Sequence, residues 1–247
     1  GADVNQPEEN GATPTYIAAQ RGHLGVLRLL VKKGADVNLL KEDGCAPAYI
    51  AAQVGHLEVL RLLVENGADV NQPEENGATP TYIAAQRGHL GVLRLLVENG
   101  ADVNQPEENG ATPTYIAAQR GHLGVLRLLV EKGADVNQAR GNGGTPTYIA
   151  AQVGHLEVLR LLVEKGADVN QPEEKGATPT FIAALNGHLE VIRLLVEKGA
   201  DVNQGGRGDA GAHRSPRGEA TWRCVRLLGR TWRRRRISRP KMTTSRS

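Results

Sequence analysis

The stretch Gly34-Ala35-Asp36-Val37-Asn38 sets the register of the whole chain. The same five residues recur with their glycine at positions 1, 34, 67, 100, 133, 166 and 199, so every step is 33 residues long. A fixed period of this size is typical of stacked supersecondary units, each of which packs only on its neighbours. The 247-residue chain is therefore expected to lack the single central core of a globular domain, and its repeated register ends near Gln204.

Each 33-residue unit contains two predicted helices, as the first copy illustrates. Asn10-Gly11-Ala12 is typical of a turn, and Thr13-Pro14 is typical of a helix start, because threonine can cap a helix and proline fits its first turn. The first helix is predicted over Thr15–Gln20 and the second from about His23 to Lys33. The second helix has apolar residues on more than one face, so neighbouring units must cover it.

Gly34 follows the second helix and is suited to the left-handed conformation that ends helices. The residues after it are predicted to form a short β-like arm. The pattern resembles the ankyrin repeat through Thr13–Ala19, Gly22-His23-Leu24, Leu29-Leu30 and Gly34–Asn38. The resemblance implies an all-α repeat solenoid of stacked helix-turn-helix units with short β-hairpin-like arms. It also implies a concave face, lined by the arms and first helices, that binds other proteins.

The register divides the chain into a repeat domain at residues 1–204 and a C-terminal segment at residues 205–247. The domain begins with a partial arm at 1–9, and its six repeats lie at about 10–42, 43–75, 76–108, 109–141, 142–174 and 175–204. Because the chain begins inside the repeated motif and without Met, we expect it to be a fragment of a longer protein.

Two positions depart from the family pattern. Thr15-Tyr16 and its equivalents stand where the family has Leu-His, with Ala48-Tyr49 and Thr180-Phe181 in two of the repeats. Repeat two also lacks the capping threonine, because Cys45-Ala46-Pro47 replaces it. Since loss of a threonine cap costs about 1 kcal/mol, we expect this repeat to nucleate folding least well.

Residues 205–247 differ from the repeats in charge. They hold 13 Lys/Arg against 2 Asp/Glu, whereas residues 1–204 hold 17 against 25. One interpretation is a disordered basic tail, with Trp232–Arg236 as a nuclear-localisation or nucleic-acid patch. We favour a frameshifted seventh repeat, because a one-base shift permits repeat-like readings of Gly208–Gly218 and Leu228–Arg236. On that interpretation no nucleic-acid binding is expected.

No constellation of residues indicates catalysis. A metal site needs several ligands that converge on one ion, and histidines of neighbouring repeats are expected to lie too far apart for that. We interpret the histidines as helix-start residues that bond nearby backbone, and the Asp36-type aspartates as turn residues. A nucleophile–base set and a phosphate-binding glycine loop are also missing from the sequence, so we expect neither an enzyme nor a cofactor. The histidines are His23, His56, His89, His122, His155 and His188.

The arm tips and the ends of the first helices are the candidate partner-binding positions, as the family resemblance implies. Acidic pairs recur at the tips, and Ala139-Arg140 replaces the pair in repeat five, so we predict an acidic fringe that attracts a basic partner. The alternative is ordinary solvated loop charge. The candidates are Glu8, Glu9, Asn10, Gln20, Arg21, Glu42, Asp43, Gln53, Glu74, Glu75, Gln86, Arg87, Glu107, Glu108, Gln119, Arg120, Arg140, Gln152, Glu173 and Glu174.

The predicted function is that of a protein–protein interaction scaffold. One alternative is a regulatory ankyrin segment of a larger enzyme or membrane-associated protein, and another is nucleic-acid or nuclear-import binding through the Arg-rich tail. No apolar run approaches the roughly 20 residues that span a bilayer. The two isolated cysteines, Cys45 and Cys224, fit a reducing compartment, so we expect a cytoplasmic or nuclear location.

The last repeat is predicted to be the unstable end of the solenoid. Terminal repeats normally need a polar outer face. Repeat six has no complete repeat after it, so we expect its second helix to fray or to self-associate. The apolar residues that we expect to lack cover are Val191, Ile192, Leu194, Leu195 and Val196.

Overall fold

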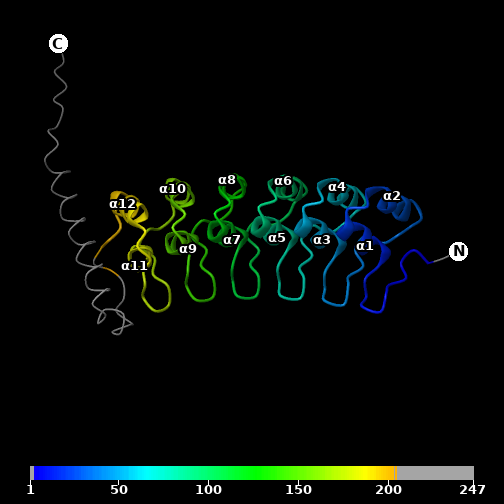
Figure 1. The fold of residues 1–247 in the computed structure, drawn as a ribbon, viewed down its shortest axis with the longest axis horizontal. Helices are drawn as coiled ribbons and strands as arrows, with labels where there is room; N and C mark the ends of the chain where they lie inside the picture. The colour runs from blue at the N-terminus through cyan, green and yellow to red at the C-terminus, as the bar shows by residue number, and fades with distance from the viewer. Residues whose placement is uncertain (1–2, 203, 205–247) are drawn as a thin grey trace, which may run out of the picture.

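The computed structural model describes residues 3–202 and Gln204, which form a single row of six helix pairs (Figure 1). Within this described part no strand is present, so the arms are hairpin-like turns rather than a sheet. The α-helices are α1 (Pro14–Arg21), α2 (Leu24–Lys32), α3 (Pro47–Val54), α4 (Leu57–Glu65), α5 (Pro80–Arg87), α6 (Leu90–Glu98), α7 (Pro113–Arg120), α8 (Leu123–Glu131), α9 (Pro146–Val153), α10 (Leu156–Glu164), α11 (Pro179–Leu185) and α12 (Leu189–Glu197).

The first helix of each pair begins at the proline, one residue before the predicted start. The Oγ1 atom of Thr13 accepts a hydrogen bond of 3.1 Å from the backbone N–H of Tyr16, which caps α1. Threonine caps α5, α7, α9 and α11 in the same way. Ala46, which precedes α3, makes no side-chain cap, so the missing cap of repeat two is confirmed.

The second helix of each pair ends where the repeated glycine begins. Gly34 has φ of 86°, and the N–H of Ala35 returns to the carbonyl of Leu30 at 3.0 Å. A positive φ of this size is readily adopted by glycine alone, so the predicted left-handed ending is confirmed. The helix itself is one residue shorter at each end than the predicted span from His23 to Lys33.

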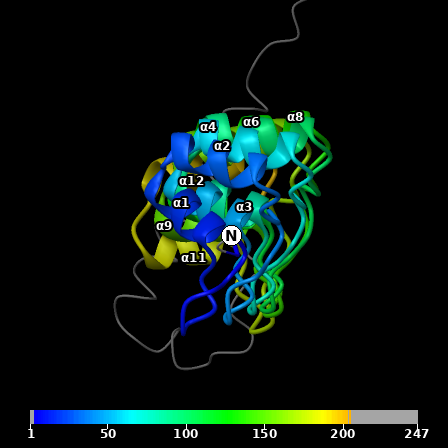
Figure 2. The ribbon, with the colours of Figure 1, turned by 90° about the vertical axis from the view of Figure 1, so that its right-hand side faces the viewer.

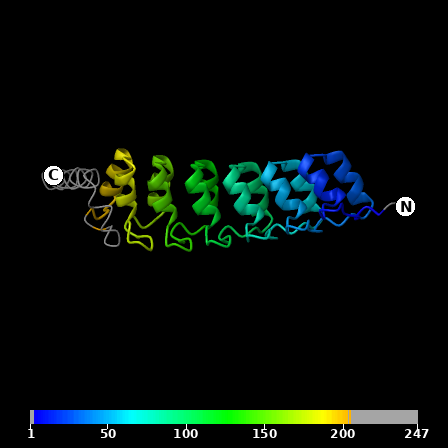
Figure 3. The ribbon, with the colours of Figure 1, turned by 60° about the horizontal axis from the view of Figure 1, so that its bottom comes forward.

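The helix pairs stack side by side with all arms on one side of the row. In Figure 1 the array arches gently, with the second helices on the convex side and the arms on the opposite side. The view along the row shows the second helices above the first helices and the arms together below (Figure 2). Figure 3 shows the arms following one another in a continuous line beneath the helix pairs.

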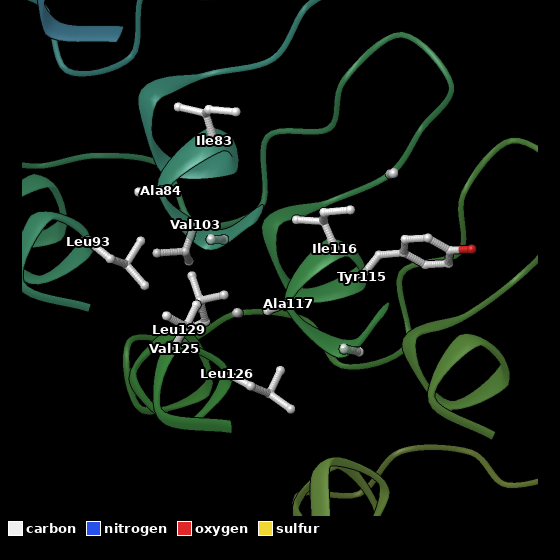
Figure 4. Packing of buried hydrophobic residues seen from close by; sticks show 14 of the residues in the cluster. Ile83, Ala84, Leu93, Val103, Tyr115, Ile116, Ala117, Val125, Leu126 and Leu129 are labelled. Atoms are coloured by element: carbon white, nitrogen blue, oxygen red, sulfur yellow. The ribbon is translucent and has the colours of Figure 1, made fainter. Parts of the chain in front are cut away.

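The core runs continuously through the stack. Leu93 and Leu126, at equivalent positions of α6 and α8, have no exposed surface, and neither has the small residue Ala117 of α7. In Figure 4, Leu93, Leu126 and Leu129 belong to one cluster that extends from one repeat into the next. Each repeat therefore completes its core with side chains of its neighbours, as expected for a solenoid.

The apolar residues of α12 that were predicted to lack cover are covered, and their equivalents at the other end of the row are not. Val191, Ile192 and Leu194 of α12 are buried, whereas Val26 and Leu29 of α2 are 51% and 58% exposed. The expectation that α12 would lack cover was wrong, because this face of each second helix packs on the preceding repeat rather than on the following one. Leu195 is also buried and Val196 is half-buried. Fraying and self-association stay predictions.

The interpretations of residues 205–247 lie outside the described residues. They comprise the frameshifted seventh repeat, the basic tail and the Trp232–Arg236 patch.

Candidate functional site

The repeated GADVN motif ties each repeat to the next. The Oδ1 atom of Asn38 accepts a 2.9 Å hydrogen bond from the N–H of Asp69, and its Nδ2 donates at 2.9 Å to the carbonyl of Gly67. The same aspartate–asparagine bond continues from Asn5 to Asp201 along the row. Asp36 accepts from the N–H of Asn38 at 2.8 Å, which confirms its role in a turn. The bond between repeats was not predicted from the sequence.

The histidines also serve the contact between repeats. The ring Nε2 of His122 lies 3.2 Å from the carbonyl oxygen of Gln86, which is 36 residues earlier. The ring of His56 packs on Gly22 so closely that a Cβ atom added to Gly22 would lie 2.8 Å from Cε1 of His56. The prediction of a helix-start residue that bonds backbone is confirmed for His122, but its backbone partner belongs to the preceding repeat and is not near it in sequence. Within the described part, no group of three His, Cys, Asp or Glu could hold a metal ion.

The arms are in a different register from the predicted one. The N–H of Glu8 bonds to the carbonyl of Ala12, and the equivalent bond joins Lys41 to Cys45 at 3.0 Å. Lys41 therefore corresponds to Glu8, and the predicted equivalence of Glu42-Asp43 and Ala139-Arg140 to the acidic pairs was wrong by one residue. We call the equivalents of Glu8 the first arm positions: Glu8, Lys41, Glu74, Glu107, Arg140 and Glu173. We call the next residues the tip row: Glu9, Glu42, Glu75, Glu108, Gly141 and Glu174.

The tip row is held by hydrogen bonds between successive arms. The N–H of Glu108 donates to the carbonyl of Asn76 at 2.9 Å, and the N–H of Gly141 donates to that of Asn109 at 2.7 Å. The glutamates of the tip row are exposed. The backbone of Glu75, Glu108 and Glu174 is therefore held in place while their carboxylates face solvent, and preorganisation of this kind lowers the entropy cost of binding.

The first arm positions meet a row of aromatic residues on the preceding first helices. The Nζ atom of Lys41 lies 6.0 Å from the centroid of the Tyr16 ring, and the guanidinium carbon of Arg140 lies 5.5 Å from that of Tyr115. Figure 4 shows Tyr115 on the side of α7 that faces away from Leu126 and Leu129. We call these residues the aromatic row: Tyr16, Tyr49, Tyr82, Tyr115, Tyr148 and Phe181.

The side chains of the aromatic row differ in solvent exposure from repeat to repeat. Tyr16, Tyr49 and Tyr115 are buried, but Tyr82 and Tyr148 are partly exposed. The carboxylates next to these two rings turn back on their own arms. The Oε1 atom of Glu107 accepts from the N–H of Ala111 at 3.2 Å, and that of Glu173 accepts from Ala177 at 3.3 Å.

The family model described as "Ankyrin repeats (3 copies)" matches residues 1–74, 71–140 and 136–205. The chain belongs to the ankyrin-repeat family. No curated protein sequence matched the chain. Ankyrin repeats are generally protein–protein interaction modules and are typically non-catalytic. Within residues 3–202 and Gln204, no helix is long and apolar enough to cross a membrane.

Repeat two of this ankyrin row has its own cluster of polar side chains. The hydroxyl of Tyr49 donates to Oε1 of Glu74 at 2.6 Å, and the thiol of Cys45 donates to its Oε2 at 3.5 Å. Burial raises the pKa of Cys45 to about 12, and the charges of Asp43 and Glu74 act in the same direction. The thiol stays protonated at neutral pH, so Cys45 is a structural donor rather than a nucleophile.

The candidate residues at the ends of the first helices share the inner face of the ankyrin stack with the arms. Burial raises the pKa of Tyr82 to about 12, and the carboxylate of Glu107 adds to this rise. The charges of Arg140 and Arg120 oppose it, so an arm residue and a helix-end residue both act on the Tyr82 hydroxyl. Arg21, Arg87 and Arg120 are exposed, and Gln20, Gln53, Gln86, Gln119 and Gln152 are half-buried.

Two exposed apolar features on this face were not among the predicted site residues. Val54 and Val153 occupy the position of the exposed arginines and are themselves exposed. Leu185 stands where the other repeats have glutamine and is 57% exposed. The substitutions are visible in the repeat alignment of the sequence itself, so they could have been found there.

Proposed function

We propose that this ankyrin domain binds a protein partner through its inner surface, formed by the tip row, the aromatic row and the ends of the first helices. The observation that supports this function is that one group of polar residues bonds between repeats while another group faces solvent. Asparagine, aspartate and histidine side chains hold repeats together. Glu75, Glu108 and Arg87 lie exposed on the resulting scaffold. A surface preorganised in this way loses little conformational entropy on binding.

The charge of the repeats supports a basic partner. Residues 1–204 hold 25 acidic and 17 basic residues, and the exposed glutamates of the tip row lie along one edge. Charge complementarity of this kind accelerates association and weakens with added salt, because exposed charges are screened over about 8 Å at physiological ionic strength.

We also propose that residues 1–204 act as one binding unit, with repeats at the boundaries given by the sequence. The hydrogen bonds between GADVN motifs support this, because they continue from Asn5 to Asp201 without interruption.

The experiment compares two double charge reversals in the full chain. Glu75→Lys with Glu108→Lys changes the tip row, and Glu98→Lys with Glu131→Lys makes the same change at the exposed ends of α6 and α8 on the convex side. A partner bound by the unmodified protein should be retained by the convex-side variant and lost by the tip-row variant. Retention by both variants, or loss from the convex-side variant alone, would contradict the proposal.

A further inference from the structure

The geometry points to a specific kind of partner, an extended protein segment that places two arginine side chains about six residues apart over Tyr82 and Tyr148. This inference rests on the proposed binding function of the inner surface, and it adds the chemistry and spacing of the partner. Three independent features of the described repeats support it: cations of the chain itself on equivalent tyrosines, two open tyrosines beside carboxylates, and a cation between them.

The chain itself shows how a cation occupies this position. Lys41 lies over Tyr16 and Arg140 lies over Tyr115, each from the arm of the following repeat. Both tyrosines are buried at 5% exposure or less. In repeat two the position is closed differently, because Glu74 accepts a hydrogen bond from the Tyr49 hydroxyl. Three of the five tyrosines are therefore covered by a side chain of their own protein.

Among the described residues no cation lies over the ring of Tyr82 or Tyr148, although the charges of Arg140 and Arg120 reach the Tyr82 hydroxyl. Each ring is partly exposed, and its first arm position is a glutamate whose carboxylate bonds to its own arm. An incoming guanidinium would meet the face of the ring and a nearby carboxylate together. Both contacts favour a cation, and arginine suits them better than lysine because its planar group stacks on aromatic rings.

The spacing follows from the stacking of the helices. Tyr82 lies on α5 and Tyr148 on α9, which are two repeats apart with α7 between them. Packed helices lie 8–10 Å apart, so the two rings are separated by about 18 Å. An extended chain advances about 3.3 Å per residue, so about six residues span this distance.

The charge of Arg140 restricts which residue the partner can place midway between its two arginines. It covers Tyr115, the tyrosine between the two open ones, and its charge faces the same surface. A third cation at the midpoint of the bound segment would meet this charge at close range. We therefore expect a neutral or acidic residue there.

The test uses two peptides of identical composition with the full chain. One carries arginines at positions i and i+6, the other carries them at i and i+3, and both are otherwise Gly/Ser with one Tyr for quantification. Calorimetry at low salt should show the i,i+6 peptide binding about fivefold more tightly, because only it engages both open tyrosines. Equal affinities of the two peptides would overturn the inference.

Two variants test the assignment of the residues. Tyr82→Leu keeps an apolar side chain at a partly exposed position, so it should abolish the preference for i,i+6 with little change in thermal unfolding. Arg140→Glu uncovers Tyr115 and supplies a third carboxylate, so it should raise the affinity of the i,i+3 peptide about fivefold. If Arg140→Glu leaves the spacing preference unchanged, the assignment to the aromatic row is wrong.

The outcome is separable from that of the proposed function. If neither spacing is preferred but the tip-row variant still loses its protein partner, the inner surface binds protein and only the inferred arginine spacing fails. If the tip-row variant retains its partner, the proposed function fails by itself.

Discussion

Helices α2 and α8 share the sequence Leu-Gly-Val-Leu-Arg-Leu-Leu-Val but have different surroundings. Val125 and Leu128 of α8 are 2% and 3% exposed, whereas the equivalent residues of α2, Val26 and Leu29, are 51% and 58% exposed. Leu27 of α2 and its equivalent in α8, Leu126, are both fully buried. The difference shows that a repeat buries one part of its second helix by itself and another part only against the repeat before it.

The largest predicted effect separates these two environments with one substitution. Leu128→Ala should destabilise the protein by about 3 kcal/mol, because it removes buried methyl groups and leaves a cavity. Leu29→Ala, at the exposed equivalent, should change stability by less than about 0.5 kcal/mol. Urea denaturation of the two variants measures the difference. Equal losses would show that Leu29 is covered in solution.

A second prediction concerns the bonds between GADVN motifs. Asn104 accepts from the N–H of Asp135 and donates to the carbonyl of Gly133, so Asn104→Ala should cost about 1–2 kcal/mol. Asn5→Ala, which loses the bond to Asp36, should cost about 1 kcal/mol. Amide exchange should also accelerate at the unpaired Asp135 N–H. An Asn104→Ala variant as stable as the unmodified protein would assign no stability to this bond.

A third prediction concerns a buried hydroxyl that each of five first helices contains. The Oγ1 atoms of Thr15 and Thr114 are buried and have no hydrogen-bond partner among the described residues. Thr114→Val keeps the shape and removes the unsatisfied oxygen, so it should stabilise the protein by about 1 kcal/mol. Thr15→Val should do the same, because this position is buried in the end repeat as well. The melting temperature of each variant is the measurement, and a decrease would contradict the prediction.

The smallest predicted effect concerns the first turn of the second helices. The Oε2 atom of Glu58 lies 3.8 Å from Nε of Arg61, and Oε1 of Glu190 lies 2.9 Å from Nη1 of Arg193. In α2 the position of these glutamates is occupied by Gly25. A Cβ at Gly25 would meet no atom within 4 Å. Gly25→Glu should therefore stabilise the protein by about 0.5–1 kcal/mol through helix propensity and the helix dipole. A gain that vanishes in 1 M salt would assign it to charge alone.

The sequence predicted the helices well, whereas its assignment of contact positions stays a prediction. Thr-Pro starts and glycine ends are local signals, so α1 and α2 were predicted to within one residue at each end. The arms and the ends of the first helices were predicted as contact positions by resemblance. The hydrogen bond between Tyr49 and Glu74 was not predicted, because the two residues are 25 positions apart in sequence. Tyr49 lies on α3, whereas Glu74 lies in the arm of the following repeat.

The sequence by itself determined the 33-residue period, the helix boundaries and the glycines with positive φ, because these depend on local backbone chemistry. Only the tertiary structure decided which carbonyl the ring of His122 meets, which tyrosines are covered, and why Val26 and Leu29 of α2 are exposed while their equivalents in α8 are buried. These features depend on the offset between neighbouring repeats. Nearly identical repeats carry no local record of that offset, so helices as similar as α2 and α8 become different surfaces once they are stacked.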